Sequence, residues 1–301
     1  MIGRFLGFLL LVLVGGGCCS VKAEEQKLQS DIDSLLLPYK ERARVGVAVL
    51  CGDSVFAGYA LDDMFPLSSV FKFPLAMAVL DSMRFAGDSL DKKIVVSKDE
   101  ILENTWSPMR DSMPDSDIEI SLDGLLRYAL VQSDNNAADA LLSRFGGCGQ
   151  VMKYLHDIGV DSTEIRIMYN EQQMHEDNLL AYENCATPLA SARLAVMLLT
   201  KDILDEDARS WLLARMSECQ TGQKRLPKYL EDKVKLMGHK TGTGFVDSKG
   251  RVTGTNDVAF MVTSSGQVWG IAVYVTDATM TFSEVEELIA LIGKSVYNRF
   301  L

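Results

Sequence analysis

The strand-like segments of this sequence lie toward its two ends, and a long stretch of helical pattern separates them. Residues 45–51 and 54–60 are predicted to form a hairpin around Gly52-Asp53, and strand patterns return in the last quarter of the chain, at VKLMGHK, NDVAFMVTS and QVWGIAVYVT. From 69 to about 217 nearly every segment has a helical pattern. This order predicts the class α/β (α+β), with an antiparallel sheet built from both chain termini and flanked by helices, plus an all-helical inserted subdomain.

Two further helices are predicted outside the central stretch. Apolar residues recur at helical spacing over 24–37, and a final helix is predicted to open at Ser283, where Glu286 has the spacing of a capping box. The sheet part then comprises 24–62 and about 218–301, and the helical part about 63–217. The two parts are expected to leave a cleft between them, where ligand sites tend to lie.

The first motif with chemical meaning is Ser69-Val70-Phe71-Lys72. Residues three apart on a helix share a face, so the Lys72 amine can reach the Ser69 hydroxyl. A serine hydroxyl becomes a good nucleophile when a base removes its proton, and a lysine can do so once its pKa is lowered. The same spacing occurs at Ser89 and Lys92, but that copy lies in a polar stretch, whereas Ser69 precedes an apolar helix that could bury Lys72. Ser69 is therefore the better candidate.

The second motif, Ser133-Asp134-Asn135, lies between two predicted helices. The Ser133 hydroxyl could relay a proton to a leaving nitrogen, and the Asn135 amide could hold a substrate carbonyl. A helix cap is the alternative interpretation, because Ser, Asp and Asn all favour that position.

The third motif, Lys240-Thr241-Gly242-Thr243-Gly244, ends an apolar strand. Its glycines allow the backbone to approach a ligand closely, and Lys240 supplies a positive charge for a carboxylate. The N–H groups of Thr243 and Ser69 could together form an oxyanion hole. Lys240 could also lower the pKa of Lys72, because like charges disfavour each other. An ordinary turn after a strand is the alternative interpretation.

In this order and on this frame, the motifs resemble those of the serine penicillin-recognising enzymes. Glu171, in the segment EQQMH, occupies the place where class A β-lactamases carry the glutamate that activates the deacylating water. The chain is identified as a member of that class, and the resemblance covers the mature chain from its first helix to its last.

The resemblance extends to the PER-type extended-spectrum branch of class A. His175 stands where class A usually has an asparagine, and the branch shares the Glu-x-x-Met-His pattern. Arg225, at the end of the segment TGQKR, stands where the branch has an arginine that helps to anchor the substrate carboxylate. Trp106 falls where the class often places an aromatic wall, and an aromatic that only packs a loop is the alternative interpretation.

The resemblance implies a hydrolase that opens the β-lactam ring of penicillins and cephalosporins, gives antibiotic resistance, and uses no cofactor and no metal. Ser69 would attack after Lys72 or water-mediated Glu171 takes its proton. Ser133 would return a proton to the lactam nitrogen, and Glu171 would drive hydrolysis of the acyl-enzyme. The implied substrate-binding residues are Asn135, Lys240, Thr241, Gly242, Thr243, Arg225, Trp106 and His175. A penicillin-binding DD-peptidase and a β-lactam-sensing module, both lacking the deacylating glutamate, are the alternatives.

Composition and motifs argue against several other functions. The 30 basic and 41 acidic side chains give a net charge of -11, whereas binding of nucleic acid needs clustered Lys and Arg. None of the three histidines lies in a zinc-binding pattern, and neither a P-loop nor a Gly-x-Gly-x-x-Gly fingerprint occurs. The chain is expected to act as a monomer on a small molecule.

Residues 1–23 are predicted to be a secretory signal peptide, because Arg4 precedes a short apolar run and a small-x-small site ends at Ala23. Residues 24–301 would then form the catalytic domain in the periplasm. Cys18 resembles a lipoprotein acceptor, so a lipid anchor is an alternative. Export would allow disulfides, in pairings that the sequence does not decide, and buried free thiols are the other interpretation of Cys51, Cys148, Cys185 and Cys219.

Overall fold

The computed structural model describes residues 17–113 and 116–300, so residues 1–16 of the predicted signal peptide lie outside the described residues. The α-helices are α1 Gly17–Leu36, α2 Lys72–Ala86, α3 Pro108–Ser112, α4 Leu122–Val131, α5 Asn135–Arg144, α6 Gly147–Asp157, α7 Glu171–Glu176, α8 Pro188–Thr200, α9 Glu206–Ser217, α10 Pro227–Leu230 and α11 Phe282–Phe300. The strands are β1 Arg44–Cys51, β2 Ser54–Tyr59, β3 Phe65–Pro66, β4 Lys93–Val96, β5 Ile118–Ser121, β6 Ile165–Arg166, β7 Cys185–Ala186, β8 Leu236–Thr243, β9 Thr255–Val262 and β10 Val268–Thr276. Short 3-10 helices are η1 Leu37–Tyr39, η2 Ser68–Phe71, η3 Lys98–Glu100, η4 Asn178–Tyr182 and η5 Glu231–Lys233.

Five strands form one antiparallel sheet in the order β2-β1-β10-β9-β8. β1, from the start of the chain, pairs with β10, from its end, between Arg44 opposite Thr276 and Cys51 opposite Trp269. Both strands are buried almost throughout, which is why each has a near-continuous apolar sequence. The prediction of a sheet built from both termini is confirmed.

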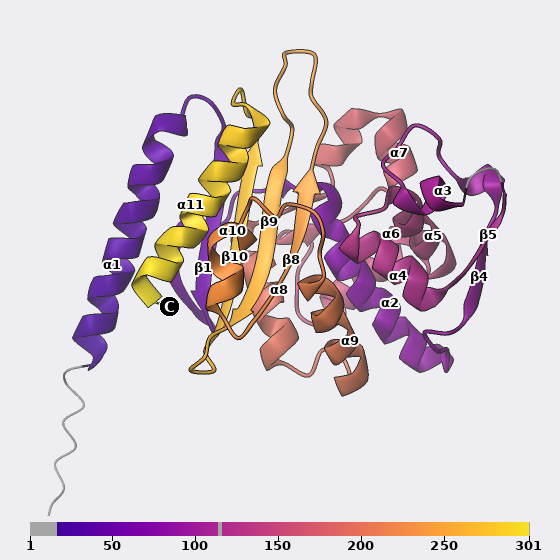
Figure 1. Ribbon diagram of the computed structural model, residues 1–301, viewed down its shortest axis with the longest axis horizontal. Helices are drawn as coiled ribbons and strands as arrows, with labels where there is room; N and C mark the ends of the chain where they lie inside the picture. Colours follow the sequence, from indigo (N-terminus) through magenta and orange to yellow (C-terminus); the bar gives the residue numbers. More distant parts are fainter. Residues whose placement is uncertain (1–16, 114–115, 301) are drawn as a thin grey trace, which may run out of the picture.

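Helices cover both faces of this sheet. α1 and α11 lie side by side on one face (Figure 1), and α1 buries Leu28, Ile32 and Leu36, which recur every four residues. α8 packs on the opposite face, where the buried apolar residues continue into the helices of the inserted part. The sheet therefore separates two apolar cores, and the inserted part lies beside only one of them.

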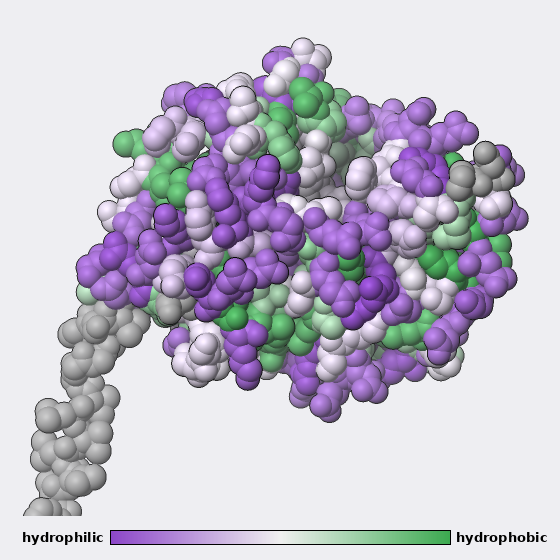
Figure 2. All heavy atoms as spheres, in the orientation of Figure 1, coloured by the Kyte–Doolittle hydropathy of each residue, from purple (hydrophilic) through white to green (hydrophobic). Residues whose placement is uncertain are grey.

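α1 runs without interruption through Ala23, the residue after which cleavage is predicted. Its buried positions begin at Leu28, so cleavage at Ala23 would leave the sheet-packing part of the helix in place. Among residues 17–113 and 116–300, no helix is both long and apolar enough to cross a membrane. Figure 2 shows mainly hydrophilic side chains on the face in view, with apolar ones in small patches.

The inserted part is mainly helical but not all-helical, which differs from the prediction. It contains the two-stranded sheet β4-β5, and β6 and β7 join β3 in a three-stranded sheet. In β4, exposed Lys93 and Val95 alternate with buried Ile94 and Val96. Four residues of alternating pattern are too few to stand out from the helical periodicity around them.

The last helix begins two residues earlier than the predicted capping box requires. The Thr281 N–H donates to the Glu284 carboxylate at 2.8 Å, and the Glu284 N–H donates to Thr281 Oγ1 at 3.3 Å. The box predicted at Ser283 and Glu286 is therefore wrong, because the same spacing occurs two residues earlier at the observed helix start.

Candidate active site

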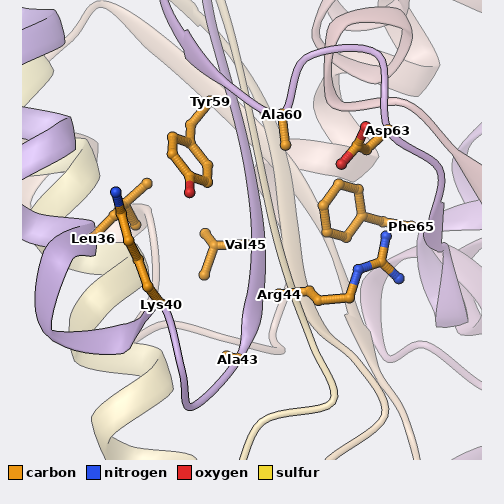
Figure 3. Close-up of a pocket in the computed structure, with 9 residues that line it drawn as sticks. All are labelled: Leu36, Lys40, Ala43, Arg44, Val45, Tyr59, Ala60, Asp63 and Phe65. Carbon is orange, nitrogen blue, oxygen red and sulfur yellow. The ribbon is translucent and has the colours of Figure 1, made fainter.

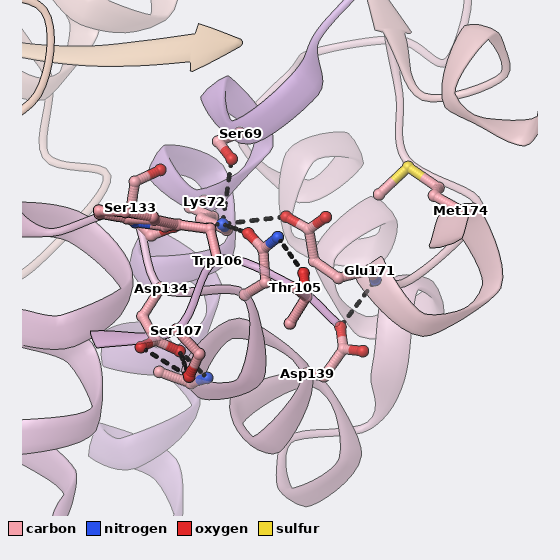
Figure 4. A network of polar contacts seen from close by, with 12 residues as sticks. Ser69, Lys72, Thr105, Trp106, Ser107, Ser133, Asp134, Asp139, Glu171 and Met174 are labelled. Atoms are coloured by element: carbon pink, nitrogen blue, oxygen red, sulfur yellow. Dashed lines mark hydrogen bonds and ion pairs between the residues drawn. The ribbon is translucent and has the colours of Figure 1, made fainter. Parts of the chain in front are cut away.

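Ser69 and Lys72 lie together where η2 continues into α2. Lys72 Nζ donates to Ser69 Oγ at 3.0 Å, and the Lys72 side chain is fully buried. The same ammonium group donates to Ser133 O at 2.9 Å and to Asn135 Oδ1 at 2.5 Å. Its fourth partner is Glu171 Oε1, also at 2.9 Å. Figure 4 shows Ser69, Ser133 and Glu171 around the Lys72 amine.

The second Ser-x-x-Lys copy has a different environment. Lys92 Nζ pairs with Asp88 at 2.7 Å, and the Lys92 side chain is 47% exposed. Ser89 and Lys92 lie in the turn between α2 and β4, where the Lys92 N–H bonds to the Ser89 carbonyl. This copy therefore lacks the buried lysine that a serine nucleophile needs.

Strands β8 and β9 hold the segment that precedes Ser69. Asn256 Nδ2, from β9, donates to Pro66 O at 2.8 Å and to Leu67 O at 3.1 Å. Gly242, on β8, passes so close that a Cβ atom there would lie 2.4 Å from Leu67 O. The close approach predicted for Gly242 is thus to the protein backbone beside the nucleophile, and a larger residue would displace that backbone.

Both interpretations of Ser133-Asp134-Asn135 apply, at different residues of the motif. Asp134 caps α5, because its side chain accepts from the Ala137 N–H at 2.8 Å. Ser133 has a left-handed φ of 61°, and its carbonyl accepts from Lys72 while its hydroxyl accepts from Lys240. The cap therefore fixes the turn that presents Ser133 and Asn135 to the site.

Lys240 reaches the site from β8. Its side chain is fully buried, and Nζ donates to Ser133 Oγ at 2.8 Å and to Thr241 O at 2.9 Å. Burial lowers the pKa of Lys240 to about 7, with the positive charge of Lys72 acting in the same direction and the Cys219 thiolate opposing it. An ammonium has three donors, so one remains for an anion in the pocket.

The free edge of the sheet can supply the predicted oxyanion hole. β8 is an edge strand, and the Gly244 N–H donates to Gly254 O at 2.7 Å. Because hydrogen bonds alternate along an antiparallel pair, the N–H of Thr243 points away from β9. Ser69 lies in the first turn of η2, where N–H groups have no acceptor within the helix. Neither N–H group is used by regular secondary structure.

Glu171 is the first residue of α7, and two side chains hold it there. Asn170 caps the helix, accepting from the Gln173 N–H at 2.9 Å. Asp139, on α5, accepts from the N–H groups of Glu171 at 2.7 Å and Gln172 at 2.8 Å. The first turn of α7 is therefore fastened to the helix that begins with Asn135, and the Glu171 carboxylate faces Lys72 (Figure 4).

A pocket of about 300 Å³ opens over these groups, lined by Ser69, Trp106, Ser133, Asn135, Thr221, Thr241 and Thr243. Trp106 is 62% exposed, and its Nε1 donates to Gln132 O at 2.8 Å. That bond fixes the ring at the pocket edge, the position expected of an aromatic wall.

Arg225 does not contact the pocket in the way the resemblance implies. The side chain is 2% exposed, and its guanidinium donates to Gly242 O, Asn256 O and Thr243 Oγ1 and contacts Glu286. Because these acceptors all belong to the protein, Arg225 acts on the pocket through Thr243, which it holds at 2.8 Å.

His175 is not among the residues that line the pocket over Ser69. It is exposed on α7, and within the described part of the chain it has no hydrogen bond or ion pair, whereas its neighbour Met174 is buried. His175 is four residues after Glu171 in α7, so the two share a side of this short helix, but the His175 side chain is exposed to solvent. The role of His175 in substrate binding stays a prediction.

Asp139 and Thr221 belong to the site and were not predicted. Asp139 is four residues after Asn135, which places both on one face of α5, and that spacing could have identified it. Thr221 lines the pocket, and its Oγ1 lies 2.5 Å from Thr241 Oγ1. Thr221 begins the segment TGQKR, but that segment does not predict the contact, because the contact depends on how the chain after α9 folds over β8.

A second cavity, of about 400 Å³, lies between the end of α1 and the first two strands (Figure 3). It is lined by Leu36, Lys40, Ala43, Arg44, Val45, Tyr59, Ala60, Asp63 and Phe65, and none of the predicted site residues is among them. Within the ranges that the structure describes, no group of three His, Cys, Asp or Glu side chains could hold a metal ion. The pocket over Ser69 is therefore the candidate active site.

Asp139→Ala is expected to slow deacylation more than acylation. The substitution leaves the N–H groups of Glu171 and Gln172 without their acceptor, which costs about 1–3 kcal/mol each if they stay buried. Glu171 then loses its fixed position, while Ser69 and Lys72 keep theirs. Stopped-flow measurement of the acylation burst and the steady state separates the two rates, and Asp139→Asn, which keeps one acceptor, should be intermediate. Equal slowing of both steps would contradict this role.

Comparisons with known proteins place the whole chain in one family. The profile of the β-lactamase enzyme family matches residues 27–300. The chain is 34% identical over 280 residues to a β-lactamase of Bacteroides uniformis, covering 92% of this chain and 93% of that one. It is 30% identical over 289 residues to the extended-spectrum β-lactamase PER-1 of Pseudomonas aeruginosa, covering 96% and 92%. A crystal structure of a class A β-lactamase from Bacteroides cellulosilyticus matches with a TM-score of 0.86 and 36% identity, covering 92% and 98%.

Proposed function

The chain belongs to class A of the β-lactamase enzyme family, which hydrolyses β-lactams through a serine acyl-enzyme and confers antibiotic resistance, and from this premise we propose that Ser69 is the acylated serine. The observation that carries the proposal is the buried Lys72 amine, in contact with both Ser69 Oγ and the Glu171 carboxylate. Nitrocefin hydrolysis by the purified protein tests it. Repeated turnover is expected, and a stoichiometric burst that then stops would indicate a DD-peptidase or a β-lactam sensor instead.

Acylation needs a base for the Ser69 proton. Lys72 Nζ donates to Ser69 Oγ, so the amine must first lose a proton before it can accept one. Glu171 Oε1 is 2.9 Å from Nζ and has no other hydrogen-bond donor among the described residues. We propose that Glu171 takes the Lys72 proton, and that the neutral amine then takes the proton of Ser69 as it attacks the lactam carbonyl.

The remaining groups act on the charges that this attack creates. The developing oxyanion accepts hydrogen bonds from the N–H groups of Ser69 and Thr243. Ser133 Oγ gives its proton to the lactam nitrogen, and the ammonium of Lys240, 2.8 Å away, stabilises the resulting negative charge. The Lys72 ammonium then returns a proton to Ser133 Oγ and takes its own proton back from Glu171, which is again a carboxylate. Glu171 removes a proton from the water that hydrolyses the ester, and that proton passes to the departing Ser69 oxygen, which frees the opened antibiotic and restores Ser69.

We further propose that cephalosporins are good substrates, as the name extended-spectrum β-lactamase of the PER-1 relative suggests. The pocket has an exposed aromatic wall at Trp106 and hydroxyl groups at Thr221 and Thr243 for polar substituents. A kinetic panel of penicillins, cephalosporins and a carbapenem tests the preference. Values of kcat/KM consistently lower for cephalosporins than for penicillins would overturn it.

We propose that the enzyme is exported to the periplasm as a monomer after removal of residues 1–23. The apolar run behind Arg4 supports export, and the outward position of residues 22 and 23 on α1 supports cleavage there. Cell fractionation with intact mass measurement tests both points. A mature protein beginning at Cys18 with added acyl mass would establish the lipid anchor instead.

Lys240→Ala is expected to lower kcat/KM roughly tenfold to 150-fold, because a charge-assisted hydrogen bond to the substrate carboxylate is worth roughly 1.5–3 kcal/mol. Steady-state kinetics with a carboxylate-bearing cephalosporin measures this. An unchanged kcat/KM would exclude Lys240 as the anchor.

The pH profile provides a control for that role. The pKa of Lys240 is lowered to about 7, so the side chain is charged below that pH and neutral above it. Since kcat/KM reports the free enzyme, it should fall as the pH rises through about 7. Lys240→Arg stays charged and should move this fall to higher pH. A fall at the same pH in Lys240→Arg would assign it to another group.

A further inference from the structure

Three residues that the proposed reaction does not use lie behind the pocket. Cys219 follows α9, His239 is on β8 and Asp257 is on β9, and their side chains are 4%, 4% and 0% exposed. His239 Nδ1 lies 2.9 Å from Asp257 Oδ1, and Asp257 Oδ2 accepts from the Leu226 N–H at 3.1 Å. The remaining ring nitrogen, Nε2, is buried without a hydrogen-bond partner in the described residues, and the charge of the imidazole acts on the neighbouring Cys219 thiol.

This arrangement has the form of an activated nucleophile. A thiol becomes reactive when a nearby base takes its proton, and a carboxylate on the other ring nitrogen orients that base. Burial alone would raise the pKa of Cys219, but the charges of His239 and Lys240 outweigh it and lower that pKa to about 7. Burial alone would lower the pKa of His239, but the charges of Asp257 and the Cys219 thiolate raise it. The two shifts favour the thiolate form of Cys219 and the protonated form of His239.

The other cysteines of the described residues lack such partners. Cys51, Cys148 and Cys185 are free thiols like Cys219, but burial raises the pKa of each. Cys51 and Cys148 are nevertheless more exposed than Cys219. Exposure and thiolate character thus predict opposite orders of reactivity, which makes the two properties separable by experiment.

Cys219 is connected to the substrate pocket through a single side chain. Its Sγ lies 3.4 Å from Thr221 Oγ1, which in turn lies 2.5 Å from Thr241 Oγ1. Both threonines line the pocket over Ser69. A small molecule in the pocket is therefore one threonine away from the thiolate, and an atom added to Sγ would press on Thr221.

We propose that Cys219 is a second reactive site of this enzyme, at which hydrogen peroxide forms a sulfenic acid and thereby inhibits β-lactam hydrolysis. The thiolate attacks one peroxide oxygen, so an S–O bond forms as the O–O bond breaks. The leaving hydroxide takes a proton from the His239 imidazolium and becomes water. Sulfur is oxidised and peroxide is reduced. The added oxygen displaces Thr221 from Thr241 and removes the thiolate charge beside Lys240, which weakens substrate binding.

The test exposes the full mature enzyme to hydrogen peroxide and follows intact mass, peptide mapping after dimedone trapping, and β-lactam hydrolysis. We expect one oxygen atom or one dimedone group at Cys219 before any other cysteine, together with a loss of kcat/KM that a thiol reductant restores. Cys219→Ser should lose both the adduct and the inhibition relative to its own untreated activity. Cys148→Ser, a matched variant at a more exposed thiol, should keep both.

The variant His239→Gln tests whether Cys219 reacts because it is a thiolate or only because reagents can reach it. It keeps Cys219 but removes the imidazolium, so the rate of dimedone labelling should fall at least tenfold even if basal hydrolysis changes. Circular dichroism verifies that His239→Gln is folded. If it is not folded, Asp257→Asn replaces it in the test, and the rate of dimedone labelling should then fall by a smaller factor. Oxidation of Cys51 or Cys148 ahead of Cys219, or oxidation of Cys219 with undiminished hydrolysis, would overturn the proposal. Basal nitrocefin turnover, measured without peroxide, tests the β-lactamase activity separately.

Discussion

Ser69→Ala is expected to abolish β-lactam hydrolysis, with kcat falling on the order of 10⁶-fold, the scale found when a serine nucleophile is removed. Among the described residues, Ser69 is the only one whose hydroxyl lies within hydrogen-bond distance of the buried Lys72 amine. The Ser133 hydroxyl is hydrogen bonded to Lys240 instead. No other hydroxyl group that lines the pocket lies next to both a base and the two N–H groups that would hold the oxyanion. Nitrocefin hydrolysis and labelling with a fluorescent penicillin measure the loss.

Ser89→Ala is the matched control, because it removes the serine of the second Ser-x-x-Lys copy. Lys92 is already paired with Asp88 on the surface, so turnover and labelling should remain near those of the unmodified enzyme. Thermal unfolding of both variants checks that each is folded. Labelling that survives in Ser69→Ala and disappears in Ser89→Ala would reverse the assignment of the nucleophile.

The relation between Ser69 and Lys72 could be predicted because it depends on one helical turn. Residues three apart share a face wherever the turn lies in the fold. The same holds for the cap at Asp134, which needs only the N–H groups of the helix that follows it. The sheet built from both termini was also predictable, since helices cover both faces of β1 and β10 and their sequences are accordingly apolar.

Relations between distant segments were not available from sequence patterns. Arg225 was expected to reach substrate, but it is enclosed by carbonyls of β8 and β9 that no local pattern brings near it. His175 was expected in the site, and it is exposed on α7 and does not line the pocket over Ser69. Gly242 was expected to approach a ligand, and its close approach to the backbone at Leu67 was not predicted. For Arg225 and Gly242 the decisive neighbour is far away in the chain.

Glu171→Ala is expected to leave an acyl-enzyme on Ser69 and to lower turnover at least 10²–10⁴-fold, the usual contribution of a general base and about 3–5 kcal/mol of barrier. Lys72 remains beside Ser69 in this variant, and it can serve as the base for acylation by losing its proton to solvent instead of to Glu171, so acylation is slowed but not abolished. Deacylation has no such substitute, because Asp139 is bound to the N–H groups that open α7. Intact mass spectrometry after addition of a cephalosporin should detect the added mass of the opened drug.

Two further variants test whether the effect of Glu171→Ala comes from the loss of a general base or only from the removal of a side chain from α7. Glu171→Gln keeps the size of the carboxylate but cannot take a proton from water, so it should accumulate the same adduct as Glu171→Ala. Glu176→Ala removes an exposed acid from the same short helix, and it should turn over normally without an adduct. If Glu171→Gln hydrolyses a cephalosporin as fast as the unmodified enzyme, then the contact between Glu171 and Lys72 at 2.9 Å only positions the lysine. Deacylation would then need a base from outside the residues that surround Ser69.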